Sequence, residues 1–136
     1  MRHKTVETNN GRLWVARLAG CSALLFVLAT SALAHHARSE YNLSRTISMK
    51  ATVTKVDWSN PHALIYFDVT DGSGTVQNWN AITGGPSRLQ RIGWTSGTLK
   101  PGDAITITGN PTKSGVHQIW LTSVVLPNGR ELSMHR

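Results

Sequence analysis

Apolar and polar residues alternate along most of the chain after residue 45, and this period of two is typical of β-strands. The runs that alternate most clearly are residues 46–58, 63–70, 75–81, 104–108 and 116–126. Within the first run the apolar positions change phase between Val53 and Val56, which predicts a β-bulge near Thr54 or Lys55. We therefore expect five strands, of which the first is long and bent.

Turn-forming residues separate these runs and indicate how the strands follow one another. Asp71-Gly72-Ser73-Gly74 predicts a hairpin turn, so the first three strands should form a meander. Gly84-Gly85-Pro86 interrupts the strand pattern, and residues 87–92 predict one or two helical turns that end at Gly93. Three strands, a short helix and two strands is the element order of the OB-fold, and a small sandwich is the alternative.

The fold class predicted from this pattern is all-β, a small five-stranded OB-like barrel. One face of the strands should fill the barrel interior. The side chains expected to point inward are Ile65, Phe67, Val69, Ile105, Ile107, Ile119 and Leu121.

The first 34 residues have the composition of a secretory signal peptide. Basic residues come first, residues 18–29 form an apolar run that is short for a membrane span, and Ala32-Leu33-Ala34 provides small residues for cleavage. Cys21 also lies in a lipoprotein-like sequence, but the apolar run continues past it, which disfavours lipidation. An uncleaved anchor is the other alternative. We expect a periplasmic or secreted protein without a stable membrane span after cleavage.

Removal of residues 1–34 changes what the composition implies. The full chain has 14 basic and 7 acidic residues, and cleavage would leave 10 basic and 6 acidic ones. This small excess gives little support for a nucleic-acid partner. The single cysteine, Cys21, leaves with the leader, which excludes a disulfide or a thiolate metal site in the mature chain. We expect residues 35–45 to be a polar arm and residues 46–136 to be the barrel domain.

Histidines provide the candidate chemistry, because imidazole is the commonest protein ligand for transition metals. Cleavage would expose His35 as the new amino terminus, with an α-amine and a ring nitrogen on the same residue. His36 can add its amide and its own ring. Asn60-Pro61 predicts a stiff turn that presents His62, and His117 follows the last loop of the barrel.

In an OB-fold the loops before the second and fifth strands flank one binding face. The arm is long enough to reach either loop, at roughly 3.3 Å per extended residue. The predicted function is therefore binding of Cu(II), or of Zn(II) as competitor, by His35 and His36, with His62 or His117 completing the site. The mature methionines, Met49 and Met134, are too few to favour Cu(I).

Other interpretations of the same residues remain open. The terminal histidines could be incidental residues on a mobile arm. Asn60-Pro61-His62 could be a structural turn with its ring hydrogen-bonded across the strands. The barrel face and its tryptophans could bind an envelope protein or a glycan, as an interaction module with no metal. The sequence contains no recognisable acid pair, phosphate loop or nucleophile motif, so we do not expect an enzyme.

The sequence contains several spaced motifs, namely His35-His36, residues 58–62, Trp79, residues 86–94 and Leu99-Lys100-Pro101-Gly102-Asp103. Together they resemble the motifs of a family of small exported bacterial proteins, domain of unknown function 6152. The resemblance implies an exported β domain without an established activity. The family pattern often has an acidic residue where this chain has Ile82, so any site that uses that acid is altered here.

Overall fold

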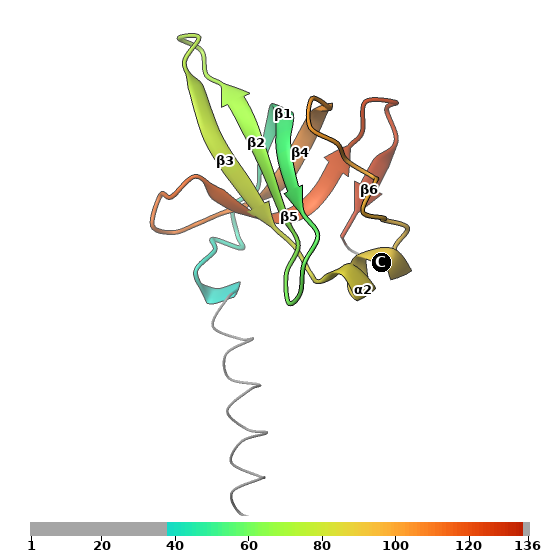
Figure 1. Ribbon diagram of the computed structural model, residues 1–136. Coiled ribbons are helices and arrows are strands. Elements are labelled where there is room, and N and C mark those ends of the chain that lie inside the picture. Colours follow the sequence, from blue (N-terminus) through green and yellow to red (C-terminus); the bar gives the residue numbers. More distant parts are fainter. Residues whose placement is uncertain (1–37, 135–136) are drawn as a thin grey trace, which may run out of the picture. The chain divides into compact units, whose positions relative to one another are not determined.

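The computed structural model describes residues 38–134, which form a closed barrel of five strands with one short helix (Figure 1). The elements are β1 (Ile47–Asp57), β2 (Leu64–Thr70), β3 (Val76–Ile82), α2 (Pro86–Arg91), β4 (Ala104–Pro111), β5 (Gln118–Val125) and β6 (Glu131–Ser133). The predicted all-β class and the predicted order of strands and helix are confirmed.

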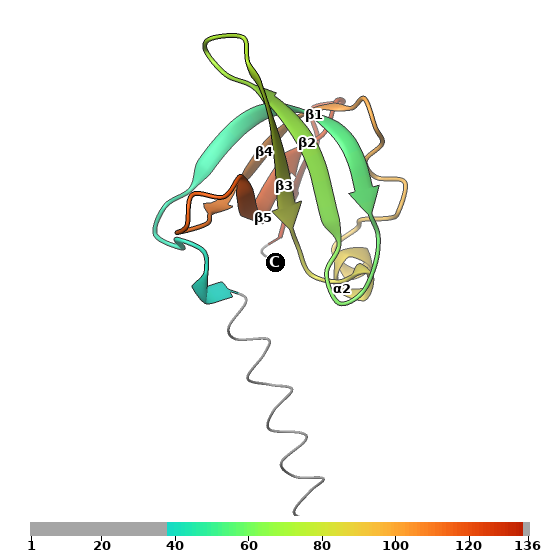
Figure 2. The same cartoon turned by 60° about the vertical axis from the view of Figure 1, so that its left-hand side comes forward.

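The strands follow one another in the sheet as β3-β2-β1-β4-β5-β6, and each neighbouring pair is antiparallel. A parallel pairing of β3 with β5 closes the barrel through Asn80–Gln118, Ala81–Ile119 and Ile82–Trp120. Figure 2 shows how β1 curves around the barrel so that it can pair with both β2 and β4. This connectivity is that of the OB-fold.

The bend in β1 is a β-bulge at the predicted position. Its pairing with β2 shifts register between Val53 and Lys55. The amide of Val53 donates to the Asp103 carbonyl at 2.9 Å, and the Val53 carbonyl accepts from the Gly102 amide at 2.8 Å. The Lys100–Asp103 turn, one of the family-like motifs, therefore fastens onto the bulged strand. A bulge increases the local twist and so helps the sheet to close.

The β2–β3 hairpin turn also forms where the sequence predicts it. The carboxylate of Asp71 accepts hydrogen bonds from the Ser73 hydroxyl at 2.6 Å and from the amides of Ser73 and Thr75 at 2.9 and 3.0 Å. These bonds, led by that of the Ser73 hydroxyl, hold the pKa of Asp71 below its ordinary value. The turn is thus locked by its own side chains.

The barrel interior contains the predicted apolar residues. Six of them are buried, namely Ile65, Phe67, Ile105, Ile107, Ile119 and Leu121. Val69 is only partly buried, because it lies near the hairpin end of β2, opposite Gln77. Alternation in the sequence therefore identified the inward face of three strands.

The ends of the strands differ from the prediction at three places. β5 begins at Gln118 and not at Val116, so His117 lies in the loop before this strand. β4 continues through Pro111, where a loop was expected, because buried Asn110 donates to the Arg45 carbonyl at 2.7 Å and holds the strand against the arm. A sixth strand of three residues, β6, pairs with the end of β5. It lies outside the closed barrel and extends the sheet.

The helix α2 begins at Pro86 and is followed by Gly93 at φ 91°, the left-handed conformation expected at a helix end. Leu89 packs its side chain into the core. In the cartoon, α2 lies beside the β1–β2 loop at one end of the barrel (Figure 1). In residues 38–134 no helix has the length and apolarity needed to cross a membrane.

Candidate functional site

The turn that precedes His62 is fixed against the segment between β3 and α2. The Asn60–Pro61 peptide bond is cis. Gly85 approaches this turn so closely that a Cβ there would lie 2.8 Å from the Pro61 carbonyl oxygen and 2.9 Å from Asn60 Oδ1. Only glycine permits this approach, which explains Gly85 at that position. The backbone on either side therefore presents His62 in a defined direction.

The His62 ring is oriented by one hydrogen bond. Its Nδ1 lies 2.7 Å from the carbonyl oxygen of Thr83, the buried residue that follows β3. A carbonyl can only accept, so Nδ1 must carry the proton. In the neutral ring the lone pair is then on Nε2, the arrangement found in metal-binding histidines whose other nitrogen donates to a carbonyl. The hydrogen bond expected for the His62 ring in a structural turn therefore exists.

Trp120 on β5 is the centre of an aromatic cluster that includes His62. The His62 ring meets Trp120 edge-on with 6.2 Å between ring centroids, and Tyr41 does so at 5.7 Å. The guanidinium carbon of Arg38 lies 5.3 Å from the Trp120 ring centroid. Arg38, Tyr41, His62 and Trp120, called the Trp120 cluster below, thus join the arm, the β1–β2 loop and β5.

The described part of the arm is attached to the barrel through Tyr41. Its side chain is buried, with 3% of its surface exposed, and it forms an isolated β-bridge with Thr112. Its hydroxyl donates to Gln118 Oε1 at 2.7 Å, and the Asn42 amide donates to the Pro111 carbonyl at 2.8 Å. The arm around Tyr41 and Asn42 is therefore docked on the barrel.

His117 lies in a different environment from His62. Its ring stacks on Trp79 with 4.5 Å between centroids and 7° between planes. Trp79 pairs with Phe67 and packs against the core, whereas Trp120 pairs with Ile82, three residues further along β3. Because side chains alternate between the faces of a strand, the two histidines contact tryptophans that point to opposite faces. The structure does not bring these two histidines together.

The other two predicted ligands, His35 and His36, lie outside the described residues. Among residues 38–134 there is no group of three or more histidine, cysteine, aspartate or glutamate side chains that could hold a metal. His62 and His117 are therefore described singly: His62 is hydrogen-bonded to Thr83 and borders Trp120, whereas His117 stacks on Trp79.

The sequence pattern did not indicate that Arg38, Tyr41 and Gln118 belong to this region. The one available signal was Tyr41, an isolated aromatic residue between Glu40 and Asn42 in a polar arm. A single apolar position has no periodicity, and its burial depends on a tertiary partner.

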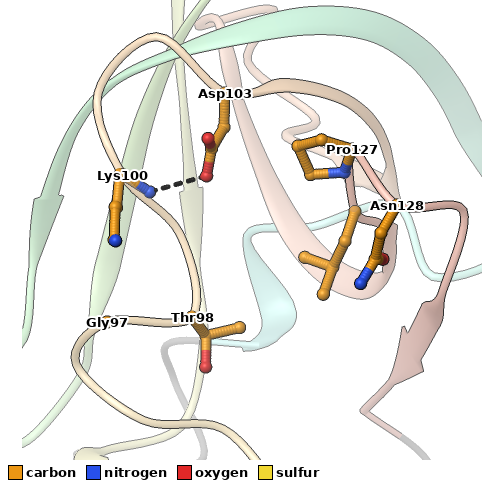
Figure 3. Close-up of a pocket in the computed structure, with 7 residues that line it drawn as sticks. Gly97, Thr98, Lys100, Asp103, Pro127 and Asn128 are labelled. Atoms are coloured by element: carbon orange, nitrogen blue, oxygen red, sulfur yellow. Dashed lines mark hydrogen bonds between the residues drawn. The ribbon is translucent and has the colours of Figure 1, made fainter.

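A separate open hollow of about 280 Å³ lies between the turn before β4 and the turn after β5 (Figure 3). Its lining residues are Gly97, Thr98, Lys100, Asp103, Leu126, Pro127 and Asn128. The Asp103 carboxylate accepts from the Lys100 amide at 2.8 Å, and Asn128 Oδ1 accepts from the Arg130 amide at 3.0 Å. The side chains of Asp103 and Asn128 thus stabilise the turns in which they lie. The polar groups of the hollow are explained by these turns without a ligand.

Taken together, the strand order, the helix between β3 and β4 and the parallel closure define a small OB-type barrel. The chain belongs to the family of unknown function DUF6152, whose model matches residues 23–119. The resemblance noted in the sequence is thereby confirmed. No curated protein and no solved structure matches the chain.

Proposed function

We propose that this is an exported metal-binding protein that holds Cu(II), with Zn(II) as competitor, through His35 and His36 at its mature amino terminus. His62 is the further ligand that we assign to the same function. The amine, the intervening amide and the imidazoles give a nitrogen donor set, which suits the tetragonal preference of Cu(II).

The observation that supports this proposal is the state of His62. Its Nδ1–H is bound to the Thr83 carbonyl at 2.7 Å, so Nε2 is available as a ligand. The ring also borders the Trp120 cluster, to which Arg38 of the arm belongs. In the sequence His36 is two residues before Arg38, a chain length of roughly 7 Å when extended.

The test compares Cu(II) affinity by calorimetric titration in three proteins. These are the protein beginning at His35, the same protein with its α-amine acetylated, and the His62→Ala variant. Acetylation blocks the α-amine as a ligand while it retains every imidazole. We expect both changes to weaken Cu(II) binding.

Binding should also depend on pH, because protons compete for the same nitrogens. The ordinary pKa values are roughly 7.7–8.0 for an α-amine and roughly 6.5 for imidazole. Affinity should therefore fall as the pH decreases from about 8 to about 6.

Mass spectrometry of the protein purified from its native source would report the mature amino terminus and any bound metal.

His117→Ala is the matched control, since it removes one histidine that stacks on Trp79 and not on the Trp120 cluster. It should leave Cu(II) affinity unchanged. Equal affinity of the free and acetylated proteins would refute a terminal-amine chelate. A loss confined to His62→Ala would move the site into the barrel loops, and an equal loss in His117→Ala would show that the histidines bind metal without specificity.

A further inference from the structure

The outer face of the sheet next to the Trp120 cluster has two ordered rows of side chains. Leu64, Ile82 and Trp120 lie opposite one another across β2, β3 and β5, and so do Tyr66, Asn80 and Gln118. Their neighbours in sequence, Ile65, Ala81 and Ile119, are buried in the barrel. Since strand residues alternate between faces, both rows point away from the core. We call these six residues the outer face.

The side-chain oxygens of Asn80 and Gln118 on the outer face already accept hydrogen bonds, whereas some of their N–H groups remain available as donors. Gln118 Oε1 accepts from the Tyr41 hydroxyl at 2.7 Å, and Asn80 Oδ1 accepts from Gln118 Nε2 at 2.6 Å. The Asn80 side-chain NH₂ and the second hydrogen of Gln118 Nε2 have no acceptor within residues 38–134. The face therefore offers N–H groups to a ligand that is rich in acceptor oxygens.

Two cations stand over aromatic rings of this face. The Arg38 guanidinium lies over Trp120 at 5.3 Å, and Lys55 Nζ lies over Tyr66 at 5.4 Å. A guanidinium stacked on a ring keeps its in-plane N–H groups available for a carboxylate. Within the described part of the chain, neither Arg38 nor Lys55 forms an ion pair. The acidic residue at the border of the face is Asp57, which pairs with Leu64.

We propose that the outer face binds an acidic oligosaccharide. Its carboxylates pair with Arg38 and Lys55, and its hydroxyl and ring oxygens accept from Asn80 and Gln118. Strands β2 and β3 and the loops beside them are the surface on which OB-folds bind oligosaccharides and oligonucleotides. The paired amide donors between two cations favour a hydroxyl-rich ligand over a nucleic acid, whose recognition would need exposed rings for base stacking.

The experiment uses the protein that begins at His35, with EDTA present so that metal binding plays no part. Tri-galacturonic acid is titrated and followed by amide and side-chain NMR shifts, with maltotriose as the neutral comparison. Shifts should concentrate at Asn80 and Gln118. Arg38→Gln and Lys55→Gln should each weaken binding by on the order of tenfold, because a charge-assisted hydrogen bond is lost.

Arg91→Gln, which changes an exposed cation on α2, is the matched control and should bind like the parent protein. The proposal is wrong if the acidic trimer does not bind at millimolar concentration, or if maltotriose binds equally well. Equal weakening by Arg91→Gln would indicate nonspecific charge attraction and would also overturn it. Tighter binding of oligo(dT) than of the acidic trimer would assign the face to nucleic acid. None of these outcomes affects the Cu(II) titrations.

Discussion

Among the glycines of the described residues, Gly109 in β4 leaves the least room for a side chain. A Cβ at this position would lie 2.5 Å from the Trp120 carbonyl oxygen and 2.9 Å from Ile119 Cδ1. The register between β4 and β5 shifts between Thr108 and Gly109. Glycine is therefore required here by the close approach of two backbones at an irregularity of the sheet.

Gly109→Ala should destabilise the fold by about 1–3 kcal/mol, because the methyl group forces backbone atoms apart in a packed region. For a domain of this size that corresponds to a decrease in Tm of roughly 4 °C or more. Thermal unfolding followed by circular dichroism measures it. Gly72→Ala is the control, since a Cβ there meets nothing within 4 Å. Equal Tm values for the two variants would contradict this account of Gly109.

Among the elements, the arm shows most clearly how a segment without a periodic pattern becomes part of the fold. Burial, followed by the charge of Glu40, raises the pKa of Tyr41 to about 12. Both effects disfavour the phenolate, and a free tyrosine titrates near 10. The pKa of Tyr41 is therefore higher in the folded protein than in the unfolded chain. Protonated Tyr41 contributes fully to the stability of the fold below about pH 10, and this contribution is lost as the pH rises towards 12.

A Tyr66→Phe variant leaves Tyr41 as the single tyrosine and allows this to be measured. Absorbance at about 295 nm should report a midpoint near 12 in the folded protein and near 10 in denaturant. Unfolding should accompany the high-pH transition, since ionisation of Tyr41 breaks its donation to Gln118. A single midpoint shared by the folded and denatured protein would show that the arm is not docked at Tyr41.

Some of these elements have a periodic signal in the sequence and others have none. Alternation predicted the strands and six buried core residues, and the phase change in the first strand predicted the bulge. Burial of Tyr41 and the short strand β6 have no periodic signal and depend on contacts made after folding. For the same reason the sequence proposed either His62 or His117 as the further ligand without choosing between them, because the surroundings of each ring depend on the tryptophan that it contacts.

At the scale of the whole barrel, the β3–β5 seam is the shortest of the pairings that close it. Three residue pairs join β3 to β5, whereas six join β1 to β4. The Asn80 amide donates to the His117 carbonyl at 3.1 Å, and the Asn80–Gln118 side-chain bond reinforces the seam from outside. Local opening should therefore begin at this seam, where the fewest backbone bonds must break.

Hydrogen exchange should show this order of opening. The Asn80 amide should exchange faster than the Ala51 amide, which lies within the β1–β4 ladder. Gln118→Ala removes two side-chain hydrogen bonds at the seam, so exchange at Asn80 should accelerate about fivefold or more while Ala51 stays unchanged. Equal acceleration at both amides would mean that the barrel opens as one unit and that the seam has no separate stability. Slower exchange at Asn80 than at Ala51 would place the first opening elsewhere in the sheet.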